Sequence, residues 1–388
     1  MEQSNKQSDR DNAIGDLRIS MGPELPAIPE RLLLAHARGE VLFLAGAGVS
    51  RSAGLPDFGG LVLAVYKALD STVHTTISDI LSDVPPTAYD RWKHYLSHHL
   101  TDYRIIAEIE RFFSRDYDVA LGMLERRMDK QSHKASRVRK RVVEVLRESS
   151  LGPTPIHRAL IRLADRGGAT AILTTNFDLL LEDAARRLRQ PLQTYALGAI
   201  PRPSHRTDFT GILHLHGALD RDPKRYSDLI VTDQDFGEFY LRRRIVPDFI
   251  YDAARLFHLV LVGYSANDPP MRYLLNAVAG DSARFPDLKE RFVFVDTHDP
   301  VALKDWKGRG IIPIPYDPAD GHAALTATLE RWADLSAIDG KKTLVDREIK
   351  RMVRTGRGNA SDADRDLFDH LIRRTDPQER TRLSGLAS

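Results

Sequence analysis

The sequence of 388 residues contains no cysteine. Without thiol groups the chain can form neither a disulfide bond nor a cysteine-ligated zinc centre, so both are excluded. The sequence also lacks the run of roughly 18–20 apolar residues that spans a bilayer. Its first twenty residues are polar and charged, without the apolar segment of a signal peptide, and we expect them to form a disordered leader, residues 1–20. These absences favour a cytoplasmic protein with no membrane partner.

An excess of charge of one sign is also missing, since 56 basic and 54 acidic residues leave a net charge of +2. Bulk charge therefore argues neither for nor against nucleic acid as a partner. The most basic stretch is residues 133–141, where Val138, Val142 and Val145 recur at helical spacing. We interpret it as an amphipathic helix with a solvated basic face. The alternative, a direct contact with nucleic acid or a partner protein, is left open.

What the sequence does contain is a regular alternation of short apolar runs and helical stretches. The runs have the length and composition of strands that are buried on both faces of a parallel sheet. This alternation predicts an α/β fold, a Rossmann-like open parallel sheet with helices on both faces. The expected strands are Val41–Leu44, Thr170–Thr174, Gly211–His216, Leu229–Val231, His258–Val262, Phe292–Val295 and Ile311–Ile314.

Two largely helical segments lie outside this alternation. Residues of about 62–150 carry apolar side chains at helical spacing, such as Ile105, Ile109 and Phe112, and predict a helical insert. Residues 336–388 predict a polar, charged helical C-terminal tail without a large apolar stripe. We expect this tail to pack on the core, on a second copy of the chain or on a partner, and so to serve in assembly.

The first candidate site follows the first strand, in Gly46-Ala47-Gly48-Val49-Ser50. Two glycines let a backbone approach a pyrophosphate closely, and the helix that follows offers N–H groups to it. Arg51 stands where the third glycine of the Rossmann fingerprint would be, so a purely structural turn explains the motif equally well. The next segment, residues 52–60, is rich in glycine and proline and can fold over a ligand.

Further candidates lie at the ends of two later strands. Ligands of open α/β sheets bind outside the carboxyl ends of the strands, which is where Asn176, Asp178 and His216 fall. The plainer alternative is that Asn176 or Asp178 caps a helix, which is more plausible for Asp178. Residues 262–268 lead from another strand into a capped helix and offer a further phosphate or ribose contact.

Two histidines alternate along the strand at residues 211–216. With a period of two, Ile212, His214 and His216 share one face of the strand. A pair of histidines can hold a metal, but no third ligand is evident nearby, so we expect no metal site. We interpret His216 as a catalytic imidazole at the mouth of the cleft and His214 as structural.

Each of these motifs is modest, but their order is specific: G-A-G-V-S, S-A-G-L-P-D-F-G-G, T-T-N-F-D, H-L-H-G and V-G-Y-S. This succession resembles the sirtuin family, which has a glycine turn with a serine, a P-D-F-R-G loop, a T-Q-N-I-D motif, a catalytic H-G histidine and a G-T-S turn. The resemblance spans roughly residues 33–316. It implies that residues 21–335 form a sirtuin-like NAD-binding domain that includes the helical insert.

The resemblance also implies a role for each matching residue. Asn176 would contact the nicotinamide ribose and order a water molecule, and His216 would be the base. The other matches would bind NAD: Gly46, Ala47, Gly48 and Ser50 around the pyrophosphate, Asp57 and Phe58 over the nicotinamide half, Thr175 in the same motif as Asn176, Asp178 at the carboxamide, Gly263 and Ser265 at phosphate and adenosine ribose, and Asp296 at that ribose.

Two departures from the family pattern matter for the activity. Protein-deacylating sirtuins have a four-cysteine zinc site, which this cysteine-free chain cannot form, and Gly59 replaces the arginine of their P-D-F-R-G loop. Both departures point towards the sirtuin-like proteins of bacterial antiphage defence, which hydrolyse NAD. Those proteins act in large assemblies, some with a HerA-type ATPase or an Argonaute-type protein, and the length of this chain favours the systems with an ATPase.

The resulting expectation is an NAD+ glycohydrolase that uses NAD as substrate, contains no zinc, forms homo-oligomers and acts as an effector of abortive infection. One alternative is an NAD-dependent deacylase or ADP-ribosyltransferase. Another is a non-catalytic NAD- or ADP-ribose-binding regulatory subunit of an ATPase or nuclease complex. The hydrolase fits the residues because nicotinamide leaves as a neutral molecule and needs no strong general acid. One amide that positions water and one imidazole base are enough.

Overall fold

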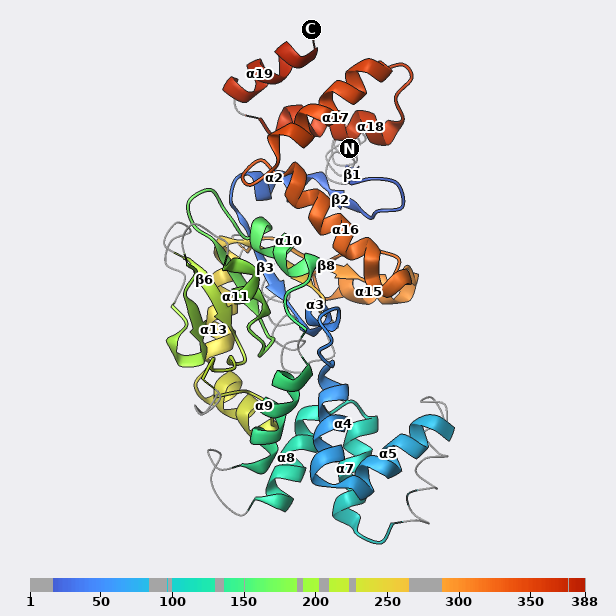
Figure 1. Ribbon diagram of the computed structural model, residues 1–388, viewed down its shortest axis with the longest axis vertical. Coiled ribbons are helices and arrows are strands. Elements are labelled where there is room, and N and C mark those ends of the chain that lie inside the picture. Colours follow the sequence, from blue (N-terminus) through green and yellow to red (C-terminus); the bar gives the residue numbers. More distant parts are fainter. Residues whose placement is uncertain are drawn as a thin grey trace, which may run out of the picture.

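A computed structural model of the chain describes residues 17–83, 96, 100–129, 136–149, 151–186, 191–201, 209–222, 228–264, 288–375 and 377–387. The molecule has three parts along its longest axis (Figure 1). A sheet with covering helices lies in the middle, a bundle of helices lies at one end, and the C-terminal helices lie at the other end.

The central sheet has seven strands in the order β5-β6-β4-β3-β7-β8-β9. Every neighbouring pair is parallel. The prediction of a Rossmann-like open parallel sheet is therefore confirmed. The strands are β3 Val41–Ala45, β4 Ala171–Thr174, β5 Thr194–Ala196, β6 Gly211–His214, β7 His258–Val262, β8 Arg291–Val295 and β9 Ile312–Pro315.

The order of the strands defines where the chain changes direction across the sheet. It starts at β3 in the middle, proceeds outward on one side to β4 and then to β5 and β6, and returns to the other side of β3 for β7, β8 and β9. The switch point therefore lies between β3 and β7. Ligands of open α/β sheets bind outside the carboxyl ends of the strands at such a point.

Alternating side chains of the strands enter two separate cores, as the period of two requires. Phe43 and Val260 face one core, which α10 and α16 cover. Leu42 and Leu259 face the other core, which α13 covers. The elements around the sheet are α2 Glu30–Ala37, α3 Ala47–Arg51, α10 Pro155–Leu163, α11 Leu180–Ala185, η2 Leu197–Ala199, α12 Asp233–Phe236, the π-helix η3 Gly237–Arg242, α13 Ile245–Leu256, α15 Pro300–Gly308 and α16 Ala319–Leu335.

The helical bundle at one end occupies the range expected for the insert. Its helices are α4 Phe58–Leu69, α5 Ser71–Asp83, α7 Tyr103–Phe113, α8 Tyr117–Met128 and α9 Arg137–Ser149. They share a hydrophobic core of their own, which Leu180, Leu219 and Val231 of the sheet domain also enter. The carboxyl-end loops of the sheet thus face the insert, and the switch point lies where the two parts meet (Figure 1).

The ends of the chain differ from expectation in one detail. Most of the predicted leader lies outside the described residues, but Arg18–Ser20 form strand β1, which pairs antiparallel with β2, Ala27–Pro29. The prediction of a disordered leader up to Ser20 was therefore wrong for Arg18, Ile19 and Ser20. The reason is that Ile19, between polar neighbours, is fully buried in the core.

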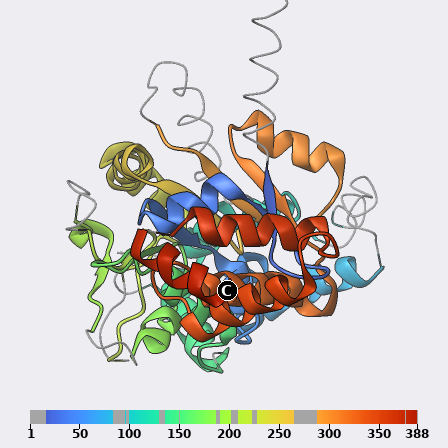
Figure 2. The same ribbon diagram turned by 90° about the horizontal axis from the view of Figure 1, so that it is seen from above.

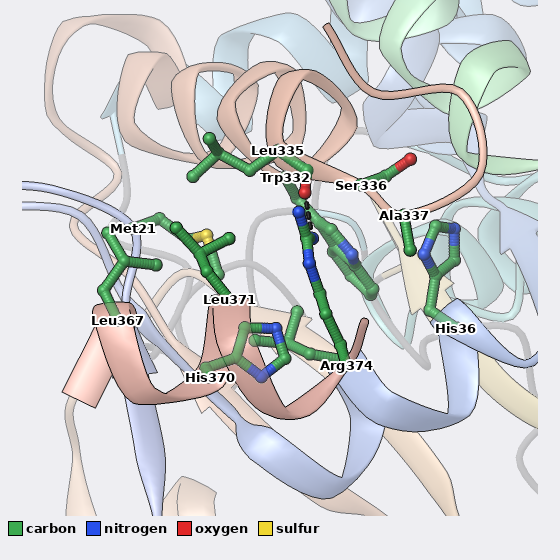
Figure 3. A pocket seen from close by; sticks show the side chains of 11 residues that line it. Met21, His36, Trp332, Leu335, Ser336, Ala337, Leu367, His370, Leu371 and Arg374 are labelled. Atoms are coloured by element: carbon green, nitrogen blue, oxygen red, sulfur yellow. Dashed lines mark hydrogen bonds between the residues drawn. The ribbon is translucent and has the colours of Figure 1, made fainter. Parts of the chain in front are cut away.

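The C-terminal tail packs on the sheet domain rather than standing free. It consists of α17 Lys342–Thr355, α18 Asp362–Arg373 and α19 Pro377–Ala387, which lie across one end of the molecule (Figure 2). Ile349, Met352 and Leu371 join the core beneath α16. A narrow cavity remains at this junction, where Arg374 donates a hydrogen bond to the carbonyl of Leu335 (Figure 3).

One expected strand is absent, and one observed strand was not expected. Leu229–Val231 form no strand; instead the amide of Ile230 donates a single hydrogen bond to the carbonyl of His216 at 2.8 Å. Strand β5 had been missed because Thr-Tyr-Ala is not an apolar run, and as an edge strand it needs little burial.

The basic stretch on α9 is a structural element in the part that is described. Arg137 pairs with Asp129, and Arg141 pairs with Glu144 and Glu148. The side chain of Arg139 is only 4% exposed, so the expected solvated face was wrong at this position. None of the helices in the described ranges is long and apolar enough to cross a membrane.

Candidate active site

Two glycine turns meet at the switch point of the sheet. Gly46 donates to the carbonyl of Val262 at 2.9 Å, and Gly48 donates to the carbonyl of Gly263 at 2.7 Å. Gly263 has φ of +62°, and a Cβ atom there would lie 2.4 Å from the backbone nitrogen of Val49. Glycine is required at these positions because the β3 and β7 turns are in backbone contact.

This contact changes the interpretation of the glycine motif. The N–H groups of Gly46, Gly48 and Val49 already donate to carbonyl groups within the protein. The close approach for which the glycines are needed is therefore made first by the protein's own backbone. Ala47 and Gly48 are exposed at the carboxyl edge of the sheet, so the outer surface of the turn still faces solvent.

A hydrogen-bonded network joins the glycine turn to the turn after β4. The Asn176 Nδ2 group donates to Ser50 Oγ at 2.9 Å and to the carbonyl of Gly46 at 3.1 Å. Ser50 Oγ donates in turn to Asp178 Oδ2 at 2.8 Å. Thr175 donates its amide to the carbonyl of Ala45 at 3.1 Å. Residues from two strand ends are thus held as one unit.

Asp178 is the buried end of this network. Its Oδ1 atom accepts the backbone N–H of Leu180 at 3.1 Å, so Asp178 also orders the start of α11. Burial raises the pKa of Asp178 above its ordinary value, although both hydrogen bonds favour the carboxylate. The N-cap position of α11 is Leu179, so Asp178 is not the cap residue; its carboxylate instead accepts the first helical amide and the hydroxyl of Ser50.

His214 has a structural partner on each ring nitrogen. Nδ1 contacts the carbonyl of Asn176 at 2.8 Å, and Nε2 contacts Glu182 Oε1 at 2.9 Å. Both partners are acceptors, so the doubly protonated imidazolium satisfies them. Burial by itself would lower the pKa of His214, but Glu182 raises it above the ordinary value. His214 therefore supports the turn that carries Asn176.

His216 does not share the face of His214, contrary to the expectation from a period of two. Strand β6 ends at His214, and the chain turns at Gly217, which has φ of +93°. The ring of His216 packs against Phe236 and Tyr240 on the other side, and its Nε2 atom lies 2.6 Å from the hydroxyl of Tyr240. The two histidines therefore have separate partners.

The protonation state of His216 follows from its surroundings. The residue is 5% exposed, and burial lowers its pKa to about 3. The imidazole is neutral at physiological pH and can accept a proton, although so low a pKa limits its strength as a base in the resting state. The register of β4 with β6 pairs Thr174 with His214, so Asn176 and His216 each lie two residues beyond a paired strand end.

The glycine- and proline-rich loop leads from α3 into the insert. Asp57 is exposed and accepts the amide of Gly60 at 2.8 Å as the N-cap of α4. The ring of Phe58 packs edge-on against Tyr117 of α8 at 6.0 Å. A Cβ atom at Gly59 would lie 2.8 Å from the Tyr117 ring, so α8 excludes a side chain there.

The remaining predicted residues are less closely connected. Asp296 is exposed at the end of β8. Burial, together with the negative charge of Asp296, raises the pKa of the Tyr316 phenol. Ser265 lies outside the described residues. Across the described part of the chain, no three histidine, aspartate or glutamate side chains come together as a metal site requires.

Three residues that the sequence did not single out complete the neighbourhood. Glu182 holds His214, Tyr240 contacts His216, and Arg139 anchors the segment before Tyr240. All three lie on helices rather than at strand ends. Thr232 and Asp235 form a capping box at the start of the helix that leads to Tyr240.

The fold and this set of strand-end contacts define a Rossmann-like domain whose polar residues gather at the switch point. Residues 170–314 match the family model of the SIR2-like domain. This match supports a sirtuin-like family for the chain, and it includes β4, β6, β7 and β8 with Asn176 and His216.

A relative with a similar sequence is uncharacterized, so it indicates no activity for this chain. An uncharacterized protein, y4cA of Sinorhizobium fredii (strain NBRC 101917 / NGR234), is 33% identical over 321 residues, which are 80% of this chain. The chain spans only 24% of the length of that relative.

Two solved structures also match. A Sir2 homologue mutant in complex with ADP-ribose has 14% identity and a TM-score of 0.35, covering 81% of this chain and 97% of that one. A structure on the mechanism and regulation of Sir2 enzymes has 13% identity and a TM-score of 0.31, covering 79% and 97%. TM-scores of this size do not establish a shared fold, so the fold assignment depends on the strand order itself.

Proposed function

We propose that the chain is an NAD+ glycohydrolase, which cleaves NAD to nicotinamide and ADP-ribose. The observation that carries this proposal is the network that joins Ser50, beyond β3, to Asn176 and Asp178, beyond β4. Strand β4 pairs with β6, the strand that precedes His216. The segments that follow neighbouring strands thus carry an amide at Asn176, a carboxyl group at Asp178 and a neutral imidazole at His216. The SIR2-like match over residues 170–314 supports NAD as the substrate.

The proposed reaction needs few groups. Pyridinium nicotinamide leaves as a neutral molecule when the glycosidic bond breaks, and the ribose then develops oxocarbenium character. Asn176 would position the ribose and the attacking water through its amide. His216 would accept the proton of the water or of a ribose hydroxyl, a contribution of roughly 10²–10⁴-fold in rate. Orientation by the rigid network supplies further acceleration.

The low pKa of His216 sets a condition on this mechanism. A base with a pKa of about 3 accepts a proton poorly unless the bound substrate raises that pKa. NAD carries two phosphate groups, and their negative charge would favour the protonated form of the imidazole when NAD binds. We therefore expect His216 to become an effective base only with NAD bound, which limits proton transfer in the empty site.

A second candidate is a non-catalytic subunit that binds NAD or ADP-ribose. It is favoured by one observation, that the Nε2 atom of His216 is engaged by Tyr240 at 2.6 Å in a buried position. In such a subunit His216 would be a packing residue. The two candidates differ in whether replacement of His216 changes turnover or only affinity.

The biological setting is part of the proposal. From the resemblance to the NAD-hydrolysing sirtuin-like proteins, we propose that the chain is a cytoplasmic effector of antiphage defence that works as a homo-oligomer, with a HerA-type ATPase as partner. The packed tail, α17–α19, presents exposed charged residues that are available for such assembly. Deacylase or transferase activity ranks below these functions because the cysteine-ligated zinc module is excluded.

The test is nicotinamide release from NAD by the purified 388-residue chain, alone and with the proposed ATPase partner, beside three variants. Asn176→Ala and His216→Ala should each lose at least about 100-fold in kcat. The matched control is His258→Ala at the opposite end of β7, which should retain the wild-type rate. Binding of NAD without cleavage, in every assembly tried, would leave the binding subunit as the better description.

A further inference from the structure

One buried contact of the candidate site has no role in the mechanism described so far. The hydroxyl of Tyr240 lies 2.6 Å from Nε2 of His216, and both residues are about equally buried, each 5% exposed. The ring of Phe236 packs edge-on against the same imidazole at 5.5 Å. Phe236 and Tyr240, four positions apart, thus pack against the imidazole of His216, and Tyr240 forms a hydrogen bond with one of its two nitrogens.

The segment that carries both aromatics is anchored at its start. Asp235 Oδ2 accepts the amides of Val231 and Thr232 at 3.0 and 2.9 Å. Arg139 of the insert donates from Nη2 to both oxygens of Asp235 at 2.8 and 2.7 Å, and from Nη1 to the carbonyl of Leu229 at 2.9 Å. The chain then continues as the π-helical turn η3, a conformation that is frequent at functional sites. Tyr240 is therefore held in place rather than resting on the ring by chance.

The relative acidity of the two groups favours one direction for this hydrogen bond, whose donor depends on the tautomer of His216. A neutral imidazole has one N–H group and one nitrogen lone pair. A phenol is the stronger acid of the two, so we expect the hydroxyl of Tyr240 to donate and Nε2 of His216 to accept. In this tautomer the ring proton resides on Nδ1, and Tyr240 occupies the lone pair that would act as the base.

We propose that Tyr240 is a catalytic proton relay through which His216 takes its proton from the substrate. The proton of the attacking water or ribose hydroxyl moves to Tyr240 Oη while the Tyr240 proton moves to His216 Nε2. The products of this step are the oxygen nucleophile, a neutral Tyr240 and an imidazolium His216, so atoms and charge balance. The inference rests on the proposed function, because it assigns a partner to the same base.

The kinetic test compares Tyr240→Phe, His216→Ala and the double variant in the nicotinamide-release assay. Phenylalanine keeps the ring that packs on His216 and removes only the hydroxyl. The relay predicts that Tyr240→Phe and His216→Ala lose kcat by a similar factor, about 10²–10⁴, and that the double variant loses no more than either. Tyr195→Phe is the matched control, because it removes a hydroxyl bonded to Gln193 on the edge strand and should leave kcat unchanged.

A second measurement does not depend on turnover. In nitrogen-15 NMR spectra of the histidine rings, wild-type His216 should be the Nδ1–H tautomer, and Tyr240→Phe should shift the Nε2 resonance. The opposite tautomer, or a Tyr240→Phe variant that keeps full kcat while His216→Ala loses it, would overturn the relay. If the wild type cleaves no NAD in any assembly, the proposed function fails, whereas the spectra still decide whether Tyr240 donates to His216.

Discussion

Replacement of Arg139 by methionine tests the conclusion that the basic stretch of α9 is structural. Arg139 donates from Nε to Glu125 at 3.0 Å and from Nη2 to Asp235 at 2.7 Å. The side chains of Arg139, Glu125 and Asp235 are 4, 11 and 8% exposed. Methionine fills much of the volume but leaves two buried carboxylates without their cation.

The expected cost follows from this burial. Breaking a buried ion pair by removal of one partner costs about 3–5 kcal/mol, because a charge remains uncompensated in the interior. Arg137 is the matched control: it lies on the same helix two residues away, but its side chain is 58% exposed where it pairs with Asp129. An exposed pair contributes about 0–1 kcal/mol, so Arg137→Met should have little effect.

The assay is urea-induced unfolding followed by far-ultraviolet circular dichroism, with the free energy of unfolding compared among wild type, Arg139→Met and Arg137→Met. We expect a loss of at least about 3 kcal/mol for the first variant and less than about 1 kcal/mol for the second. Equal, small losses in both would refute the reasoning, and the stretch would then be a solvated basic surface open to nucleic acid.

Other predictions follow from the same contacts. Gly263→Ala should lower the free energy of unfolding by more than about 2 kcal/mol in urea titration, because φ is +62° and the new Cβ atom would meet Val49. Gly168→Ala is the control and should leave that free energy unchanged, because the space around Gly168 is open. A Gly263→Ala variant as stable as the wild type would contradict the close contact. The ion pair of His214 with Glu182 should give a stability that depends on pH. The pKa of His214 is raised in the folded state. Its contribution to the free energy of unfolding is therefore fully present below a pH of about 6.5, the ordinary pKa of histidine, and is lost as pH rises through the folded-state pKa. Burial alone would raise the pKa of Glu182, but the hydrogen bond to His214 lowers it. The contribution of Glu182 to the free energy of unfolding is therefore lost only as pH falls below the ordinary pKa range of a glutamate. His214→Gln should abolish the loss on the alkaline side, and an unchanged pH profile of thermal unfolding in that variant would count against the pair.

The sequence predicted the sheet well because its strands are buried on both faces. Runs such as Val41–Ala45 and His258–Val262 are continuous and apolar, which few other structures require. Strand β5 carries no such run, and the segment at 229–231 is apolar for a different reason, since Leu229 and Val231 fill the core of the insert. Apolar composition alone could not separate these two cases.

The candidate site was predictable to the extent that it lies at strand ends. Parallel strands bring Ser50, Asn176 and Asp178 to one edge, so their proximity follows from the fold. Tyr240 and Glu182 could not be found in this way, because their contacts depend on how helices pack beside the sheet. The early end of β6 at His214 likewise turned His216 away from the face that a regular strand would give it.

The most direct test of the proposed activity is a proton NMR time course of NAD with the 388-residue chain and with its Asn176→Ala variant. We expect the wild type to convert NAD into equal amounts of nicotinamide and ADP-ribose, with no other acceptor present, and the variant to leave NAD intact. NAD that stays intact with the wild-type chain, both alone and mixed with the proposed ATPase partner, would contradict the claim that this site cleaves the nicotinamide–ribose bond.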